Sequence, residues 1–149
     1  MTRVPPYRRW SLLGLVAAGG TIGTALRQGL LLLAPDLERF PVTTFAVNLA
    51  GAFALGLLLE VLVRSGPDEG RRRGIRLFVG TGVLGGFTTY SALAAATATL
   101  AVGGLAGWAV AYALGTVVLG AAMSVAGIAL GGAIARRRPP RIEAGQARS

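Results

Sequence analysis

The sequence predicts an all-α membrane protein with four transmembrane helices in each subunit and a break in the third helix. The composition is 53% hydrophobic and 14% charged, with a mean hydropathy of +0.62, whereas soluble domains carry about 25% charged residues. Four apolar stretches each reach the length of about 20 residues that crosses a bilayer as a helix. Because lipid offers no hydrogen-bond partners to the backbone, we expect these stretches to be helices.

The residue content excludes several functions. The 149 residues include no His and no Cys, so there is no imidazole base, thiolate nucleophile or ordinary zinc site. We therefore predict that the chain is not an enzyme. The net charge of +9 does not indicate nucleic-acid binding, because the arginines form short clusters between apolar runs and no basic patch with interleaved aromatic residues is found.

The predicted organisation is one membrane domain between two polar ends. We expect a cytoplasmic N-terminal segment at residues 1–10, a four-helix transmembrane domain at 11–135, and a disordered Arg- and Pro-rich tail at 136–149 that could contact lipid headgroups. The four predicted spans are 11–33, 42–63, 77–102 and 105–135.

The distribution of arginine predicts the orientation. All 15 basic residues are Arg, and 13 of them lie in the N-terminal segment, the second connection and the tail. The first connection contains only Arg39, and the third has no charge. By the positive-inside rule, both termini are expected in the cytoplasm of a cell (inner) membrane.

The first two spans each contain one notable polar residue. Arg27 is the one formal charge well inside a predicted span; it either snorkels to the membrane surface or lines a vestibule that attracts anions. In the second span, the Asn48 amide either bonds across helices or serves as a donor in a pore.

The third span predicts an interrupted helix, because the pair Gly85-Gly86 is followed by Thr88-Thr89. Such a break exposes carbonyl oxygens that can bind a hard cation, and the alternative is a packing kink. In the fourth span, Tyr112, Thr116, Gly120 and Ser124 share one helical face, where the hydroxyls could instead bond to the preceding turn. Small residues four apart predict close helix packing: Gly19/Gly23, Ala52/Gly56, Gly103/Gly107 and Gly127/Gly131.

Three motifs, in order on a four-span chain, resemble the Fluc/CrcB family of fluoride channels. Residues 19–27 are similar to its Gly-Gly-x-x-Gly-x-x-x-Arg, and residues 44–51 to its Thr-x-x-x-Asn-x-x-Gly. Residues 80–91 are similar to its Gly-Thr-Gly-x-x-Gly-Gly-x-Thr-Thr-Phe-Ser, with Tyr90 at the Phe position. The resemblance covers roughly residues 19–124.

The resemblance implies a fluoride-selective channel for passive efflux, formed by a subunit paired with an inverted copy in an antiparallel dimer. A structural Na⁺ that is not transported would be bound at the dimer centre by carbonyl oxygens of Gly85 and Thr88. Arg27 would lie at a vestibule. The implied fluoride path is lined by Asn48, Tyr90, Ser91, Leu93, Tyr112 and Thr116.

The chain departs from the family pattern at Leu93, where the family has a second Phe, at Ala92, where it has a hydroxyl, and at Gly120, where it often has Ser. One pathway could therefore be degraded. The strong arginine bias also favours pairing with an oppositely oriented paralogous subunit over pairing with itself. The alternatives are a non-conducting structural partner subunit and a small multidrug or guanidinium exporter, which needs an acid that the first span lacks.

Overall fold

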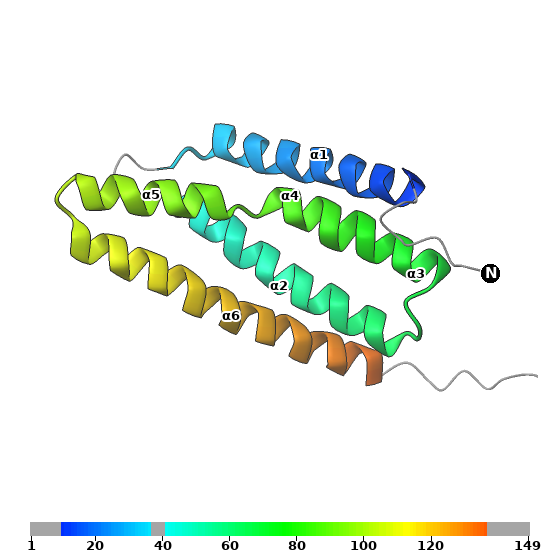
Figure 1. Cartoon of the computed structure of the whole chain (residues 1–149). Helices are drawn as coiled ribbons and strands as arrows, with labels where there is room; N and C mark the ends of the chain where they lie inside the picture. Colours follow the sequence, from blue (N-terminus) through cyan, green and yellow to red (C-terminus); the bar gives the residue numbers. More distant parts are fainter. Residues whose placement is uncertain (1–9, 37–40, 137–149) are drawn as a thin grey trace, which may run out of the picture.

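The computed structural model describes residues 10–36 and 41–136. The expectations for the N-terminal segment before Trp10, for Arg39 and for the tail after Arg136 fall outside these residues. In the described part of the chain every regular element is helical, and the helices lie side by side as antiparallel rods (Figure 1). The elements are α1 (Trp10–Leu33), α2 (Val42–Arg64), α3 (Gly70–Ile75), the π-helix η2 (Arg76–Leu84), α4 (Gly85–Phe87), α5 (Tyr90–Val102) and α6 (Ala106–Arg136).

Four helical segments are long and apolar enough to cross a membrane, which confirms the predicted number of spans. They are Trp10–Leu33, Val42–Arg64, Gly70–Val102 and Ala106–Arg136. The third begins at Gly70 rather than at the predicted Leu77. The arginine-rich segment before Leu77 is helical because arginine is a good helix former and its side chains bond back to the preceding turn.

Two interfaces are the most extensive in the bundle: α2 packs along α6, and α1 packs along η2 and α4. Glycine permits both. A Cβ on Gly23 would overlap the Val83 carbonyl oxygen, and one on Gly127 would overlap the Phe53 carbonyl oxygen. The predicted close packing is therefore confirmed at these glycines. It is wrong for Gly103 and Gly107, because these lie in the α5–α6 turn and the first turn of α6, where no other helix approaches.

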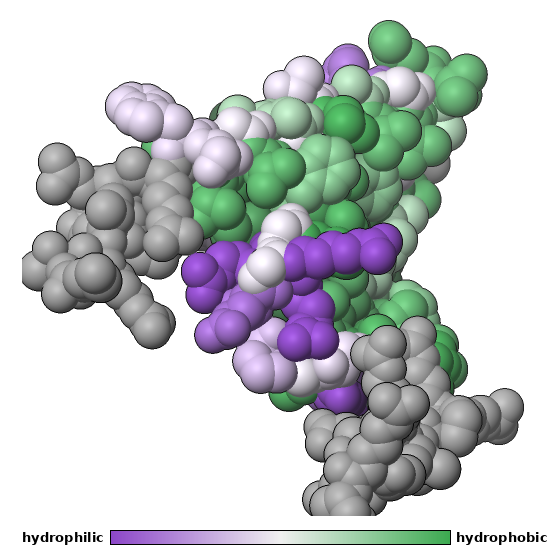
Figure 2. Space-filling view, turned by 90° about the vertical axis from the view of Figure 1, so that its right-hand side faces the viewer, coloured by the Kyte–Doolittle hydropathy of each residue, from purple (hydrophilic) through white to green (hydrophobic). Residues whose placement is uncertain are grey.

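The outside of the bundle is suited to lipid. Large apolar side chains are exposed along all four spans, including Leu26, Leu59, Val102 and Leu114. The start of α1 and the end of α6 lie at the same end of the bundle as the α2–α3 connection (Figure 1). Figure 2 views this end and shows hydrophilic side chains gathered on it, with apolar surface beyond. The chain is thus a multi-pass membrane protein.

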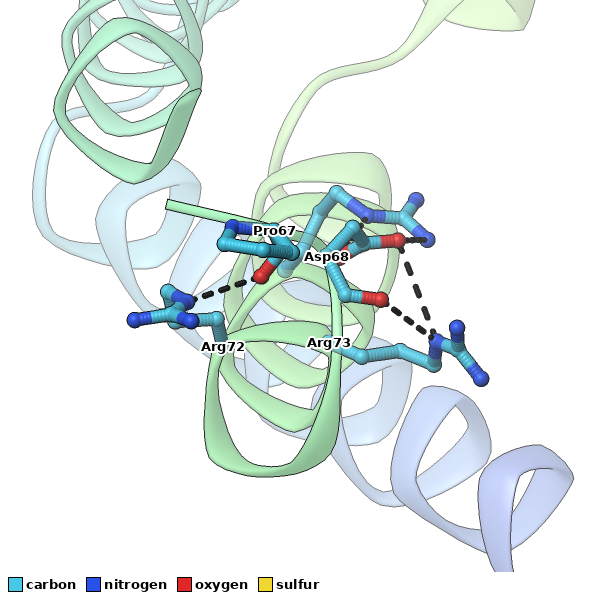
Figure 3. A network of polar contacts seen from close by, with 5 residues as sticks. Pro67, Asp68, Arg72 and Arg73 are labelled. Atoms are coloured by element: carbon cyan, nitrogen blue, oxygen red, sulfur yellow. Dashed lines mark hydrogen bonds and ion pairs between the residues drawn. The ribbon is translucent and has the colours of Figure 1, made fainter. Parts of the chain in front are cut away.

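The α2–α3 connection is ordered by arginine side chains (Figure 3). Arg76 donates from Nε and Nη2 to the two carboxylate oxygens of Asp68, at 3.0 and 2.8 Å. Arg72 donates to the Pro67 carbonyl at 2.8 Å, and Arg73 to the Asp68 carbonyl at 3.1 Å. The hydrogen bonds from Arg76 lower the pKa of Asp68 from its usual value. This connection is therefore a fixed turn.

Candidate functional site at the break of the third span

The third span is broken at two threonines. Thr88 has φ −80° and ψ 158°, and Thr89 has φ −149° and ψ 119°, so both are extended between α4 and α5. The predicted interruption is confirmed, but Gly85 and Gly86 themselves remain helical. A Cβ on Gly86 would overlap the Gly20 carbonyl oxygen of α1, so glycine serves here for close packing rather than for the break.

Hydrogen bonds satisfy several of the backbone groups at the break. The Thr88 N–H and hydroxyl both donate to the Leu84 carbonyl, each at 3.0 Å. The Thr89 hydroxyl oxygen accepts from the Ala92 N–H at 3.2 Å and so caps α5. Asn48 of α2 bonds to both backbone groups of Thr89: its Oδ1 accepts from the N–H at 2.8 Å, and its Nδ2 donates to the carbonyl at 3.1 Å.

A pocket of about 350 Å³ opens beside the break, between α2, the broken span and α6. Tyr90, at the start of α5, is 82% exposed and so projects from the protein surface. Leu93, one turn later, is 9% exposed and packs inside the bundle. The structure brings six of the predicted site residues to this pocket: Asn48, Gly85, Thr88, Tyr90, Leu93 and Thr116.

The other predicted site residues lie outside the pocket lining. The Ser91 hydroxyl pairs with the Thr89 hydroxyl at 3.1 Å. The Tyr112 ring packs near Phe45, with ring centroids 6.3 Å apart, and its hydroxyl oxygen is buried and finds no hydrogen-bond partner among the described residues. Thr116, which does line the pocket, donates from its hydroxyl to the Tyr112 carbonyl at 2.7 Å. This is the bond to the preceding turn that the sequence analysis gave as an alternative. Arg27 is half-buried, and its Nε finds no partner within residues 10–36 and 41–136.

The break offers ligands of one chemical kind. Within the described chain, the carbonyl oxygens of Gly85 and Thr88 accept no hydrogen bond. No group of three His, Cys, Asp or Glu residues that could bind a metal is found there either. Neutral oxygen ligands suit a hard cation of low charge and not a transition metal. The donor set therefore fits an alkali ion.

Sequence reasoning missed Asp36, which lies in the connection before α2. Its Oδ1 accepts from the N–H groups of Thr43 and Thr44 at 2.7 and 3.1 Å, and its Oδ2 from the Thr44 hydroxyl at 2.6 Å. A carboxylate is favourable at this helix N-terminus. The Thr43-Thr44 pair at the start of the apolar run was the signal for a capped helix, but the acid lies too far upstream for the usual capping pattern.

Comparisons with known proteins agree on one family. The family profile described as "CrcB-like protein, Camphor Resistance (CrcB)" matches residues 14–128. The chain is 56% identical over 124 residues to the "Fluoride-specific ion channel FluC 2" of Leifsonia xyli subsp. xyli, covering 83% of this chain and 86% of the relative. It is 47% identical over 118 residues to "FluC 1" of Cutibacterium acnes (78% and 82%) and 43% identical over 123 residues to a "FluC" of Thermus thermophilus (80% and 94%).

Proposed function

Because this chain belongs to the CrcB-like family, we propose that it is a subunit of a fluoride-selective channel in the cell membrane. Its curated relatives are named fluoride-specific ion channels. The channel would let cytoplasmic fluoride leave down its own gradient and so lower fluoride toxicity. It is not an enzyme, and passive flow requires no ATP.

The observation that carries this proposal is the pocket at the break. Residues that the motifs assign to ion handling come from distant parts of the sequence and line this one pocket. Its outer side is apolar protein surface with Tyr90 exposed. The pocket wall is mostly apolar, and it includes the polar residues Asn48, Thr88, Thr89 and Thr116. Such a cavity fits an ion pathway, because irregular backbone at membrane depth is tolerated only where it is buried or lines a cavity.

The fluoride path would combine donors with aromatic ring edges. A small anion must exchange its hydration for groups placed along the path without binding too tightly to leave. Asn48 still has one N–H that bonds to nothing in the described chain. The ring edges of Tyr90 and Tyr112 carry partial positive charge. The buried, unpartnered Nε of Arg27 supports a vestibule that attracts anions. Ser91, Leu93 and Thr116 complete the proposed wall.

The carbonyls of Gly85 and Thr88 would bind a structural Na⁺, which would supply a fixed positive charge beside the pathway. Two carbonyls are fewer than a hard cation requires. The pocket is open, so the remaining ligands are proposed to come from the same residues of an inverted partner. The exposed Tyr90 would be covered in the same dimer.

The partner is proposed to be a paralogous subunit of opposite orientation rather than a second copy. Arg64, Arg71, Arg73 and Arg136 all belong to the end of the bundle that Figure 2 views. Such a bias favours insertion with this end, and both termini, in the cytoplasm. An inverted dimer of one sequence would require half of the chains to insert against this bias.

A non-conducting partner subunit is the second candidate function, and Leu93 is the residue that favours it. Leu93 lies in the pocket wall and offers no ring edge to an anion. A channel with this chain would then conduct through residues of the paralogue alone.

Fluoride efflux from proteoliposomes that contain only this purified chain tests both candidates. A fluoride electrode would follow efflux with Na⁺ present, and chloride efflux would be the selectivity control. Fluoride-selective efflux supports a conducting subunit that pairs with itself and contradicts the heteromer. Silence of folded protein, followed by efflux on co-expression with a paralogue of opposite arginine bias, supports the heteromer. Silence in both preparations refutes the channel.

A further inference from the structure

The side-chain amide of Asn48 forms two hydrogen bonds with the backbone of a single residue in another span, Thr89. It accepts from the Thr89 N–H at 2.8 Å and donates to the Thr89 carbonyl at 3.1 Å, across 41 residues of sequence. Together these two bonds satisfy both backbone groups of Thr89. Asparagine is well suited to this task, because its planar side chain carries one donor and one acceptor side by side.

The break depends on this pairing. Thr89 lies between the end of α4 and the start of α5, and its N–H and carbonyl form no backbone hydrogen bond with either helix. An unpaired backbone group in an apolar medium is costly. Thr88 bonds to Leu84 within its own span, and the Thr89 side chain caps α5. Within the described chain, the backbone groups of Thr89 bond only to Asn48.

The pairing also sets the direction of the Thr88 carbonyl. The N–H of Thr89 and the C=O of Thr88 belong to one planar peptide unit, and no cis peptide bond is present in the described residues. In a trans peptide the N–H and C=O point in opposite directions. Since the N–H points to Asn48, the Thr88 carbonyl must point away from Asn48, and it accepts no hydrogen bond within the described chain.

We propose that Asn48 is a positioning residue, which holds the Thr88–Thr89 peptide so that the Thr88 carbonyl is presented as an ion ligand. This rests on the proposed function, in which that carbonyl binds Na⁺. Asn48 would then be required for cation binding through the backbone of the broken span, in addition to any contact of its free N–H with fluoride.

The test uses the full-length protein assembled with the partner subunit with which it conducts in the efflux experiment, either the paralogue or a second copy. The assembly is placed in lipid nanodiscs, with Na⁺ varied against N-methyl-D-glucamine at constant ionic strength. The readout is the Na⁺ concentration that gives half of the maximal rise in melting temperature. Asn48→Leu removes both bonds at similar volume. Asn48→Ser is the milder variant, because its short side chain cannot reach both groups of Thr89. Thr44→Val is the control: it removes a hydrogen bond from the same helix, to Asp36, without touching the break.

Both Asn48 variants are expected to raise the half-maximal Na⁺ concentration by about tenfold or more, the loss that follows from about one unmade hydrogen bond. Hydrogen exchange in the peptide that contains Thr89 should accelerate in both. Thr44→Val should lower the melting temperature but leave the Na⁺ midpoint unchanged.

The outcomes distinguish the positioning role of Asn48 from the proposed sodium site on which it rests. Asn48 variants with the wild-type Na⁺ midpoint would overturn the positioning role while leaving the sodium site intact. A wild-type melting temperature that ignores Na⁺ would overturn the sodium site and the positioning role together, and fluoride efflux from the same protein would show that channel function stands without them.

Discussion

Replacement of single glycines in α1 tests the close packing beside the break. A Cβ on Gly23 would overlap the Val83 carbonyl oxygen and lie 2.9 Å from the Phe87 backbone nitrogen, whereas a Cβ on Gly29 would meet nothing within 4 Å. Both glycines are inside α1, so Gly→Ala brings both variants the same gain of about 1 kcal/mol in helix propensity. The two variants therefore differ only in what the new methyl group meets.

The expected magnitude follows from these contacts. Overpacking costs about 1–3 kcal/mol, and the upper end applies at Gly23 because backbone atoms cannot rotate away. Gly29→Ala should stabilise the protein, and Gly23→Ala should be about 3 kcal/mol less stable than Gly29→Ala. At about 3 °C per kcal/mol for a chain of this size, the melting temperatures should differ by about 9 °C.

The assay is thermal unfolding of both variants and the wild type in the same detergent or nanodisc, with fluoride efflux measured alongside. Because Phe87 is the last residue of α4, displacement of α1 by Gly23→Ala should also reduce efflux, whereas Gly29→Ala should conduct like the wild type. Equal melting temperatures for the two variants would refute the packing argument. A normal efflux rate in a destabilised Gly23→Ala would refute the link between this contact and the break.

Three further perturbations test other parts of the structure. Asp36→Ala removes three hydrogen bonds to the first turn of α2 and should destabilise the protein by about 1–2 kcal/mol, as measured by denaturant unfolding; an unchanged stability would contradict the capping role. Asp68 has a pKa that Arg76 lowers on folding, so its contribution to stability is present above about pH 4 and is lost as the pH falls through the lowered pKa. Wild type and Asp68→Asn should therefore differ in melting temperature at pH 7 and converge in strong acid, and a constant gap would refute the pairing. Leu93→Phe places a ring edge in the wall of the pocket and should raise fluoride efflux through the assembled channel severalfold; unchanged or reduced efflux from a folded variant would contradict an aromatic requirement at this position.

The sequence was sufficient for the features that depend on local composition. The four spans were predictable because apolar length alone decides whether a helix can cross a bilayer. The interruption of the third span was predictable because glycine and threonine weaken a helix there. The position of the break was not, because Gly85 and Gly86 remain helical and Gly86 packs closely against α1. No pattern in the neighbouring sequence indicates the contact between Gly86 and α1.

The same distinction applies to the candidate site. The motifs placed Gly85, Thr88 and Tyr90 at the break, since all lie within one segment of chain. Sequence reasoning left open whether Asn48 bonds across helices or donates into a pore, because the choice depends on a residue 41 positions away. Asp36 was missed for a similar reason: its contact with α2 spans a connection, and no local pattern marks it.

The contact of Asn48 with the third span and the contact of Asp36 with the start of α2 explain why α2 is central to the site. The apolar sequence of α2 gives little indication of this. At one end Asp36 accepts from N–H groups in the first turn of α2, and about a third of the way along α2 Asn48 satisfies both backbone groups of Thr89. Because α2 is fixed against α6 by glycine contacts at Gly56 and Gly127, it provides a rigid support for the break. The carbonyls of Gly85 and Thr88 are left without partners by the same arrangement. The asparagine thus holds two backbone groups while two others stay unpaired beside an open pocket, and the proposed ion and partner subunit would complete that pocket.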